Sequence, residues 1–304
     1  MDVLSNIAII FISIFFEALP FLLLGCLISS VIERYVSNEM MAKLIPKNPI
    51  LGSIVGILMG FFIPACDCAV IPVTKRLIKK KVPINVAISF MLSSPIINPV
   101  VIISCYYAFY NTHPSMFWGR LLLGVVIALV IGIIMGIVFN KKEVVRDNEY
   151  EECACHSDHD TKHSFKNDFV FITKHTAYDF FDVVKYLMLG ALLASLIQAL
   201  LPTSVMTMFN DNLALSILVM MLFAYLISLC STSDSFVGRS LLSSFSEGSI
   251  LAYLIVGPMI DVKNTIVLLG NFKSKFVFTL IALIFVLVFI VCLLGAGLLW
   301  KNIF

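Results

Sequence analysis

The chain alternates between long apolar segments and short polar ones along its whole length. A helix needs about 20 apolar residues to cross the hydrocarbon core of a bilayer. The pattern therefore predicts an all-α polytopic membrane protein with about eight transmembrane helices, near residues 6–32, 50–72, 84–109, 117–139, 171–200, 213–236, 249–270 and 276–300. Prolines interrupt the third and the seventh of these segments, so both are expected to be broken helices or re-entrant hairpins.

The two halves of the chain resemble each other. Phe15–Glu33 aligns without a gap to Phe180–Gln198, with eight of nineteen positions identical, and the match includes Gly25 with Gly190. Two further matches follow in the same order: Ile63–Leu77 with Ile227–Leu241, and Ser94–Val100 with Gly257–Lys263. This order predicts a duplicated membrane protein with two homologous repeats, and interrupted helices at matching positions of such repeats point to a transporter's binding site.

Polar residues between the apolar segments indicate the domain boundaries and the orientation. The first membrane repeat is predicted at 1–140, a polar linker at 141–170 and the second repeat at 171–304. A basic loop after the second span holds Lys75, Arg76, Lys79, Lys80 and Lys81. Because short basic loops stay in the cytoplasm, eight crossings predict that both termini and the 141–170 linker are cytoplasmic, in the cell membrane.

Composition supports the membrane assignment. Hydrophobic residues make up 60% of the 304 residues and charged ones only 13%, with a mean hydropathy of +1.01, whereas soluble domains are about half apolar and a quarter charged. A net charge of +2 gives no reason to expect a nucleic-acid partner. The sequence contains neither a phosphate-binding glycine loop nor a nucleophile with its base, so we do not expect an enzyme.

The sharpest local motif is Pro64-Ala65-Cys66-Asp67-Cys68-Ala69-Val70-Ile71-Pro72. Its bracketing prolines are expected to prevent a regular helix. Thiolates suit soft cations and metalloids, so Cys66, Asp67 and Cys68 are a candidate substrate site. The alternative is that the cysteines only pack and that Asp67 neutralises the neighbouring basic cluster.

The matching segment of the second half is Cys230-Ser231-Thr232-Ser233-Asp234-Ser235. Carboxylates inside a membrane are costly and usually mark a pathway, a relay or an ion pair. Cys230, Ser231 and Asp234 are therefore further candidates for substrate binding, although the hydroxyl groups could instead bond to their own backbone. Broken helices also expose polar backbone groups, which adds the polar residues at the two proline breaks, Asn98 and Asp261.

One carboxylate on the first helix of each half is a candidate for proton or ion coupling. Glu17 lies near the middle of its span with no basic residue nearby in sequence, and Asp182 occupies the matching position. Simple ion pairing is an alternative for Asp182 with Lys185, and equally for Asp261 with Lys263.

The linker contains a short tract rich in cysteine and histidine, which is typical of metal binding. Its spacing is not that of a zinc finger. We expect a flexible loop that binds zinc or another soft metal, with an incidental polar linker as the alternative. The candidate ligands are Cys153, Cys155, His156, His159 and His163.

At these motifs the sequence resembles the predicted permeases of the ArsP/YraQ type. Four ordered features carry the resemblance: P-x-C-x-C-x3-P, the Lys-rich loop, SSPIINPVV, and C-S-T-S-D-x-F with G-P-M-I-D-x-K. The resemblance covers essentially the whole chain and implies a cytoplasmic-membrane permease. Characterised relatives are linked to export of trivalent organoarsenicals, and others to divalent or soft metals. The family pattern implies the site residues Cys66, Cys68, Asn98, Cys230, Asp234, Asp261 and Lys263.

Asp67 stands where many relatives have a small hydroxyl residue, and its negative charge favours a cationic metal. The sequence thus predicts a secondary transporter that exports a thiophilic metal ion or metalloid, such as zinc, copper or a trivalent (organo)arsenical. Its expected partners are the lipid bilayer and a small inorganic or organometallic solute. Two alternatives remain: a membrane subunit of a two-protein metal-handling complex, and a carrier of an amphipathic envelope molecule.

Overall fold

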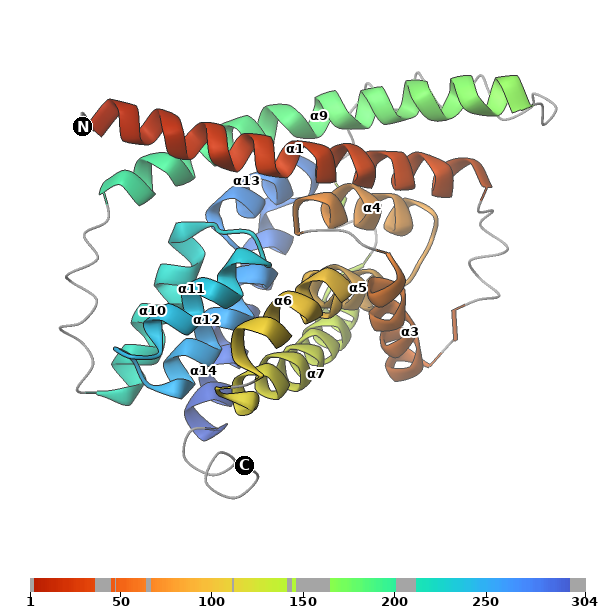
Figure 1. Cartoon of the computed structure of the whole chain (residues 1–304). Coiled ribbons are helices and arrows are strands. Elements are labelled where there is room, and N and C mark those ends of the chain that lie inside the picture. Colours follow the sequence, from red (N-terminus) through yellow and green to blue (C-terminus); the bar gives the residue numbers. More distant parts are fainter. Residues whose placement is uncertain are drawn as a thin grey trace.

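The structure is a computed structural model that describes residues 3–35, 45–46, 48–63, 67–110, 112–140, 144–145, 165–200 and 212–295. Over these residues the regular elements are helices (Figure 1). Their bounds are α1 Val3–Tyr35, α3 Pro49–Phe62, α4 Asp67–Lys79, α5 Ile84–Ile97, α6 Pro99–Phe109, α7 Pro114–Val138, α9 Phe165–Leu200, α10 Leu213–Ile227, α11 Ser233–Leu241, α12 Glu247–Met259, α13 Val262–Asn271 and α14 Ser274–Leu294. The predicted all-α fold class is confirmed.

The helices α5 and α12 form the centre of the molecule. Every residue of α5 is buried, as is α12 from Ser249 to Met259. A helix that is apolar on all sides is stable only when other helices surround it. Here α5 packs against α3 and α7, α12 packs against α10 and α14, and the two central helices also contact each other.

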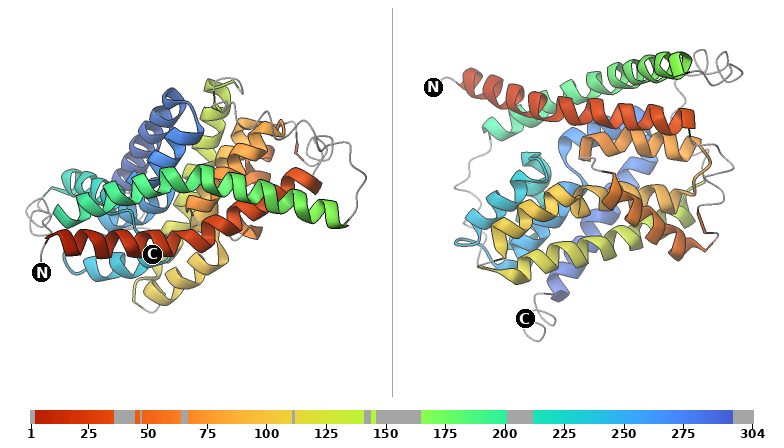
Figure 2. Two further views of the ribbon diagram at one scale, coloured as in Figure 1. Left: turned by 90° about the horizontal axis from the view of Figure 1, so that it is seen from above. Right: turned by 45° about the vertical axis from the view of Figure 1, so that its right-hand side comes forward.

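The long helices α1 and α9 pack together and run in opposite directions across one side of this core (Figures 1 and 2). Beneath them, α1 packs on α4 and α9 packs on α13. A Cβ atom on Gly25 would lie 2.6 Å from that of Ala69 in α4, and one on Gly190 would lie 2.9 Å from the carbonyl oxygen of Lys263 in α13. The two glycines that align in the sequence therefore each allow a long helix to approach a short one.

Both predicted breaks in the proline-interrupted segments are present. The axes of α5 and α6 differ by 42°, and α12 ends at Met259 before α13 begins at Val262. At each break a polar side chain caps the following helix: Asn98 accepts a hydrogen bond from the Val100 N–H, and Asp261 from the Asn264 N–H. The prolines themselves, Pro95 and Pro258, lie inside the preceding helices.

Among the described residues, five helical segments are long and apolar enough to span a membrane, or six if the bent pair α5 and α6 is one span. The apolar helices α3 and α10 have only 14 and 15 residues, which gives each about 20–23 Å of length. The continuous segments predicted at 50–72 and 213–236 were therefore wrong. Helix α3 ends at Phe62 and α10 ends at Ile227. The polar helices α4 and α11 are the next helices along the chain in each case. The total of eight crossings stays a prediction.

The order of helices recurs along the chain. A long helix, two short ones, a broken pair and a second long helix appear as α1, α3, α4, α5–α6 and α7, and again as α9, α10, α11, α12–α13 and α14. This order agrees with the duplication that the sequence predicts, which itself remains a prediction.

The basic residues expected in a solvated loop belong instead to a packed helix. Lys75 and Arg76 lie in α4 and are each only 5% exposed. Arg76 donates to Asp179 of α9 at 2.7 Å and lies 3.6 Å from Glu33 of α1, and Lys75 donates to Asn271 of α13 at 3.3 Å. Burial became possible because neighbouring helices supply carboxylate and amide oxygens, which the local sequence does not indicate.

Candidate functional site

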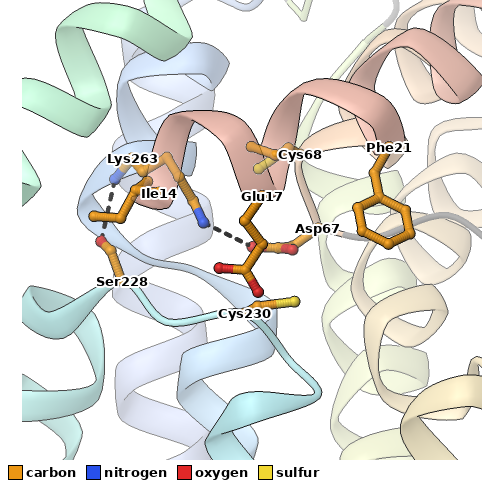
Figure 3. A pocket seen from close by; sticks show the side chains of 9 residues that line it. Ile14, Glu17, Phe21, Asp67, Cys68, Ser228, Cys230 and Lys263 are labelled. Atoms are coloured by element: carbon orange, nitrogen blue, oxygen red, sulfur yellow. Dashed lines mark hydrogen bonds and ion pairs between the residues drawn. The ribbon is translucent and has the colours of Figure 1, made fainter. Parts of the chain in front are cut away.

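A small cavity lies where α1, α4, α13 and the segment after α10 meet (Figure 3). Its volume is about 20 Å³, close to that of a single water-sized particle. It is lined by Ile14, Glu17, Ala18, Phe21, Asp67, Cys68, Ser228, Cys230 and Lys263. Charged and thiol side chains from both halves of the chain thus converge on one space that also has an apolar lining.

The start of α4 supplies Asp67 and Cys68. Both side chains are buried, and Cys68 is not part of a disulfide. The expectation that the prolines prevent a regular helix was wrong for Pro72, which lies within α4. Since proline has no N–H, Pro72 cannot donate to the Cys68 carbonyl one turn earlier. A carboxylate also suits the first turn of a helix, where the N–H groups carry partial positive charge.

The segment after α10 supplies Ser228 and Cys230. Ser228 has φ 51° and ψ 44°, so it ends α10 in the left-handed region. Few residues other than glycine adopt this conformation, and where they do it often accompanies a functional site. The turn brings Cys230 to the cavity, where its Sγ lies 3.4 Å from the Thr232 hydroxyl. In Figure 3, Cys230 and Cys68 lie on opposite sides of Glu17.

The start of α13 supplies the positive charge. The Lys263 ammonium group lies 3.5 Å from Asp67 and 3.4 Å from Asp261. The Asn264 amide donates to Asp67 at 2.8 Å. Asp67 therefore pairs with the second half of the chain, and the alternative that it neutralises Lys75 and Arg76 was wrong. The alternative of an ion pair between Asp261 and Lys263 is confirmed.

The charges of this cluster are unequal. Glu17, Asp67 and Asp261 are three carboxyl groups around one ammonium group. Glu17 is exposed and stands at the rim of the cavity, whereas Asp261 is fully buried. When all four groups are ionised, the cluster has an excess of negative charge, and an apolar surrounding makes such an excess attractive to a cation.

A second buried polar cluster lies beside the cavity. Asp234 accepts a hydrogen bond from the Tyr253 hydroxyl at 2.9 Å. Arg120 of α7 donates to the Ser235 hydroxyl at 2.6 Å and to the Ser231 carbonyl at 3.0 Å. Ser231 directly follows Cys230, so this cluster contacts the segment that forms one wall of the cavity.

Some predicted site residues do not reach the cavity. Asn98 caps α6 and does not line it. Asp182 forms the ion pair with Lys185 at 2.6 Å that the sequence left open, and it lines a separate cavity of about 10 Å³ with Lys75, Arg76 and Asp179. Glu17, the other coupling candidate, does line the main cavity.

Other predictions fall outside the described residues. Cys66 lies outside the described residues, directly before Asp67, where α4 begins. The linker ligands also lie outside the described part of the chain, namely Cys153, Cys155, His156, His159 and His163. Within the described residues, no three His, Cys, Asp or Glu side chains are placed to hold a metal ion.

Four residues of these clusters were missed by sequence reasoning: Arg120, Ser228, Tyr253 and Asn264. Arg120 offered a clear signal, because it is a lone charge inside the apolar segment 117–139. Tyr253 lies in an apolar run and Ser228 lies between Ile227 and Leu229, and nothing in the sequence singles them out.

Comparison with known proteins agrees with this architecture. A family model described as a predicted permease, of the ArsP type, matches residues 3–296. The chain belongs to this family. It is 40% identical over 289 residues to the UPF0718 protein YcgR of Bacillus subtilis, covering 95% of this chain and 96% of that protein. It is also 35% identical over 285 residues to a Streptococcus mutans protein named "Putative two-component membrane permease complex subunit", covering 94% and 93%.

No solved structure matches the permease. Family membership and the apolar helices together identify it as a multi-pass membrane protein.

Proposed function

We propose that this permease is a secondary transporter that exports a thiophilic metal ion or metalloid, and that the cavity between α1, α4 and α13 is its substrate site. The observation that carries this proposal is that Cys68 and Cys230, one from each half, line the same cavity as the carboxylates of Glu17 and Asp67. Thiolates bind soft metals and metalloids, and carboxylates balance the positive charge. Zinc, monovalent copper and a trivalent organoarsenical are the candidate substrates.

The position of the site also supports transport. Inverted or parallel repeats place substrate sites at their interface, next to interrupted helices. This cavity lies between segments of both halves, beside the break that separates α12 from α13. Its small volume of about 20 Å³ favours an ion over the headgroup of an envelope molecule.

Lys263 fits a site that releases its substrate. Its ammonium group already lies between Asp67 and Asp261, so an arriving cation competes with it for the same two carboxylates. A site with such a built-in competitor binds its cation only transiently, as transport requires. Cys66 is included in the proposed site because it precedes Asp67 by one residue.

The remaining features of the transporter follow from the sequence. We place it in the cytoplasmic membrane, with both termini and the 141–170 linker in the cytoplasm. The Cys/His tract of that linker, residues 153–163, is proposed to bind zinc on the cytoplasmic side.

A second candidate function is that the permease works as one subunit of a two-component complex. The observation that favours it is the name of the Streptococcus mutans relative, a subunit of a "two-component membrane permease complex". In that case transport by the purified chain alone is absent and returns when the second component is reconstituted with it.

Transport by purified protein in liposomes tests the main proposal. Uptake of zinc, monovalent copper and phenylarsenite is compared in the wild type, Cys68→Ser and Cys230→Ser. We expect each serine variant to lower the rate for the transported substrate at least about tenfold, since loss of a ligand or its support commonly costs that much affinity. Cys292→Ser is the matched control, because Cys292 is a buried free thiol on α14 that does not line the cavity.

The proposal is overturned if the wild type transports one of these substrates and both serine variants transport it at the same rate. Equal losses in Cys68→Ser, Cys230→Ser and Cys292→Ser also count against it, because they indicate a general effect of losing any buried thiol.

A further inference from the structure

Arg120 is the largest of the fully buried side chains, at 1% exposure. It reaches from α7 to the start of α11, where it binds the Ser231 carbonyl and the Ser235 hydroxyl. Cys105 of α6 also interacts with it. Its Nε atom is buried and has no hydrogen-bond partner. Buried arginines normally pair with a carboxylate, yet neither main partner of Arg120 is charged.

The nearest suitable carboxylate points elsewhere. Asp234 is 2% exposed and interacts electrostatically with Arg120, but its side chain is turned toward α12. One oxygen accepts the Tyr253 hydroxyl, and the other has no hydrogen-bond partner. That second oxygen lies against Gly257, where an added Cβ would be only 2.5 Å away.

Two opposite charges are thus buried close together without pairing. Asp234 and Ser235 lie in the first turn of α11, and Ser231 lies in the turn directly before it. Each of the two side chains keeps one buried atom without a hydrogen-bond partner, Arg120 Nε and Asp234 Oδ2, so each has an atom with which it could bind the other. The bonds of Arg120 to Ser231 and Ser235 are already charge-assisted, because the guanidinium group is ionised. A pair with Asp234 replaces them with bonds to an oppositely charged group and gives the two unpartnered atoms, Arg120 Nε and Asp234 Oδ2, a partner.

The exchange affects the cavity directly. The carbonyl that Arg120 holds belongs to Ser231, and the preceding residue is Cys230 in the cavity wall. Asp234 also donates its backbone N–H to the Cys230 carbonyl at 3.0 Å. When Arg120 leaves Ser231, the segment from Ser228 to Thr232 loses the contact that fixes it against α7.

We propose that Arg120 is a positioning residue that latches the Cys230 wall of the cavity. In the closed state it binds Ser231 and Ser235, and in the open state it binds Asp234. The inference rests on the proposed function only in treating this cavity as the transport site. Such a two-state element, with two discrete sets of partners, is what a transport cycle requires.

The test measures how fast Cys230 reacts with N-ethylmaleimide in purified protein that keeps its other cysteines, with the modification followed at Cys230 by peptide mass spectrometry. Ser235→Ala removes a partner of the closed state, and Tyr253→Phe releases Asp234 from α12. Both are expected to raise the reaction rate about tenfold, as expected for losing one hydrogen bond to a charged group. Asp234→Asn weakens the open-state partner and is expected to lower the rate by a similar factor.

Two matched controls separate the latch from a general loosening. Ser249→Ala removes a buried serine hydroxyl that bonds only other serines, including Ser216. Tyr225→Phe removes a tyrosine hydroxyl that donates to Thr265. Neither is expected to change the labelling rate by more than about twofold, because neither contacts Arg120 or Asp234.

Opposite shifts in Ser235→Ala and Asp234→Asn support the latch, because a purely structural loss accelerates labelling in both. The proposal is overturned if Asp234→Asn is labelled faster than the wild type, or if Ser235→Ala and Tyr253→Phe are both unchanged. If Ser235→Ala does not fold, Tyr253→Phe alone decides, since it changes a single hydroxyl. Labelling needs no substrate, so its outcome is independent of whether zinc, copper or an arsenical is transported.

Discussion

The ion pair between Arg76 and Asp179 is predicted to be a main link between α4 and the long helices α1 and α9. Arg76→Met removes the guanidinium group and leaves Asp179 without its partner in a buried position. The Arg76 and Asp179 side chains are 7% and 10% exposed, and their atoms approach to 2.7 Å. Removing one partner of a buried pair typically costs about 3–5 kcal/mol, and we expect the free energy of unfolding to fall by that amount.

The loss should come mainly from the stranded carboxylate rather than from the missing attraction. Ser29 of α1 also donates to Asp179 at 3.3 Å, which is too weak to replace a guanidinium group. Replacing both charges with apolar side chains of similar size is often close to neutral. The double variant Arg76→Met/Asp179→Leu is therefore expected to be more stable than Arg76→Met alone.

The assay is unfolding of the protein in detergent micelles by increasing fractions of sodium dodecyl sulfate, followed by far-ultraviolet circular dichroism. Glu247→Gln is the control, because its pair with His113 is half exposed, at 3.5 Å. An exposed pair contributes at most about 1 kcal/mol. The reasoning is refuted if Arg76→Met costs less than about 1 kcal/mol, or if the two substitutions add when combined.

Three further predictions concern the cavity, the helix contacts and the linker. Lys263→Met should lower the free energy of unfolding by about 3–5 kcal/mol when a chelator is present, since two buried carboxylates lose their counter-ion. Added zinc should raise the melting temperature of this variant more than that of the wild type. An equal rise in the variant and the wild type contradicts the proposed competition between Lys263 and the cation. Gly25→Ala places a methyl group against Ala69, and this overpacking should lower the free energy of unfolding by about 1–3 kcal/mol in the same assay. An unchanged unfolding midpoint means that α1 and α4 do not pack this closely. Replacing the cysteines and histidines of 153–163 with serine should lower the number of zinc ions bound per chain, measured by calorimetry, while transport in liposomes continues. An unchanged number of bound zinc ions refutes the role of this tract.

The sequence by itself determined that this is an all-helical membrane protein. An apolar segment of about 20 residues can cross lipid as a helix, because a helix satisfies its backbone N–H and C=O groups within the segment. It also located both helix breaks, since Pro95 and Pro258 each remove a backbone donor just before a capping residue. The matched motifs pointed to Cys68, Cys230 and Lys263, and these residues do meet in one cavity.

Tertiary structure alone decided which residues are partners. Lys75 and Arg76 read as a solvated loop because the groups that compensate them, Asp179 and Asn271, lie about 100 and 200 residues away in sequence. The pair of Asp67 with Lys263 also joins residues that are far apart in the sequence, and no local pattern encodes a contact across that separation. Burial of a charge depends on the field of all neighbouring helices, so the role of a lone arginine such as Arg120 becomes visible only when α7 and α11 are packed together.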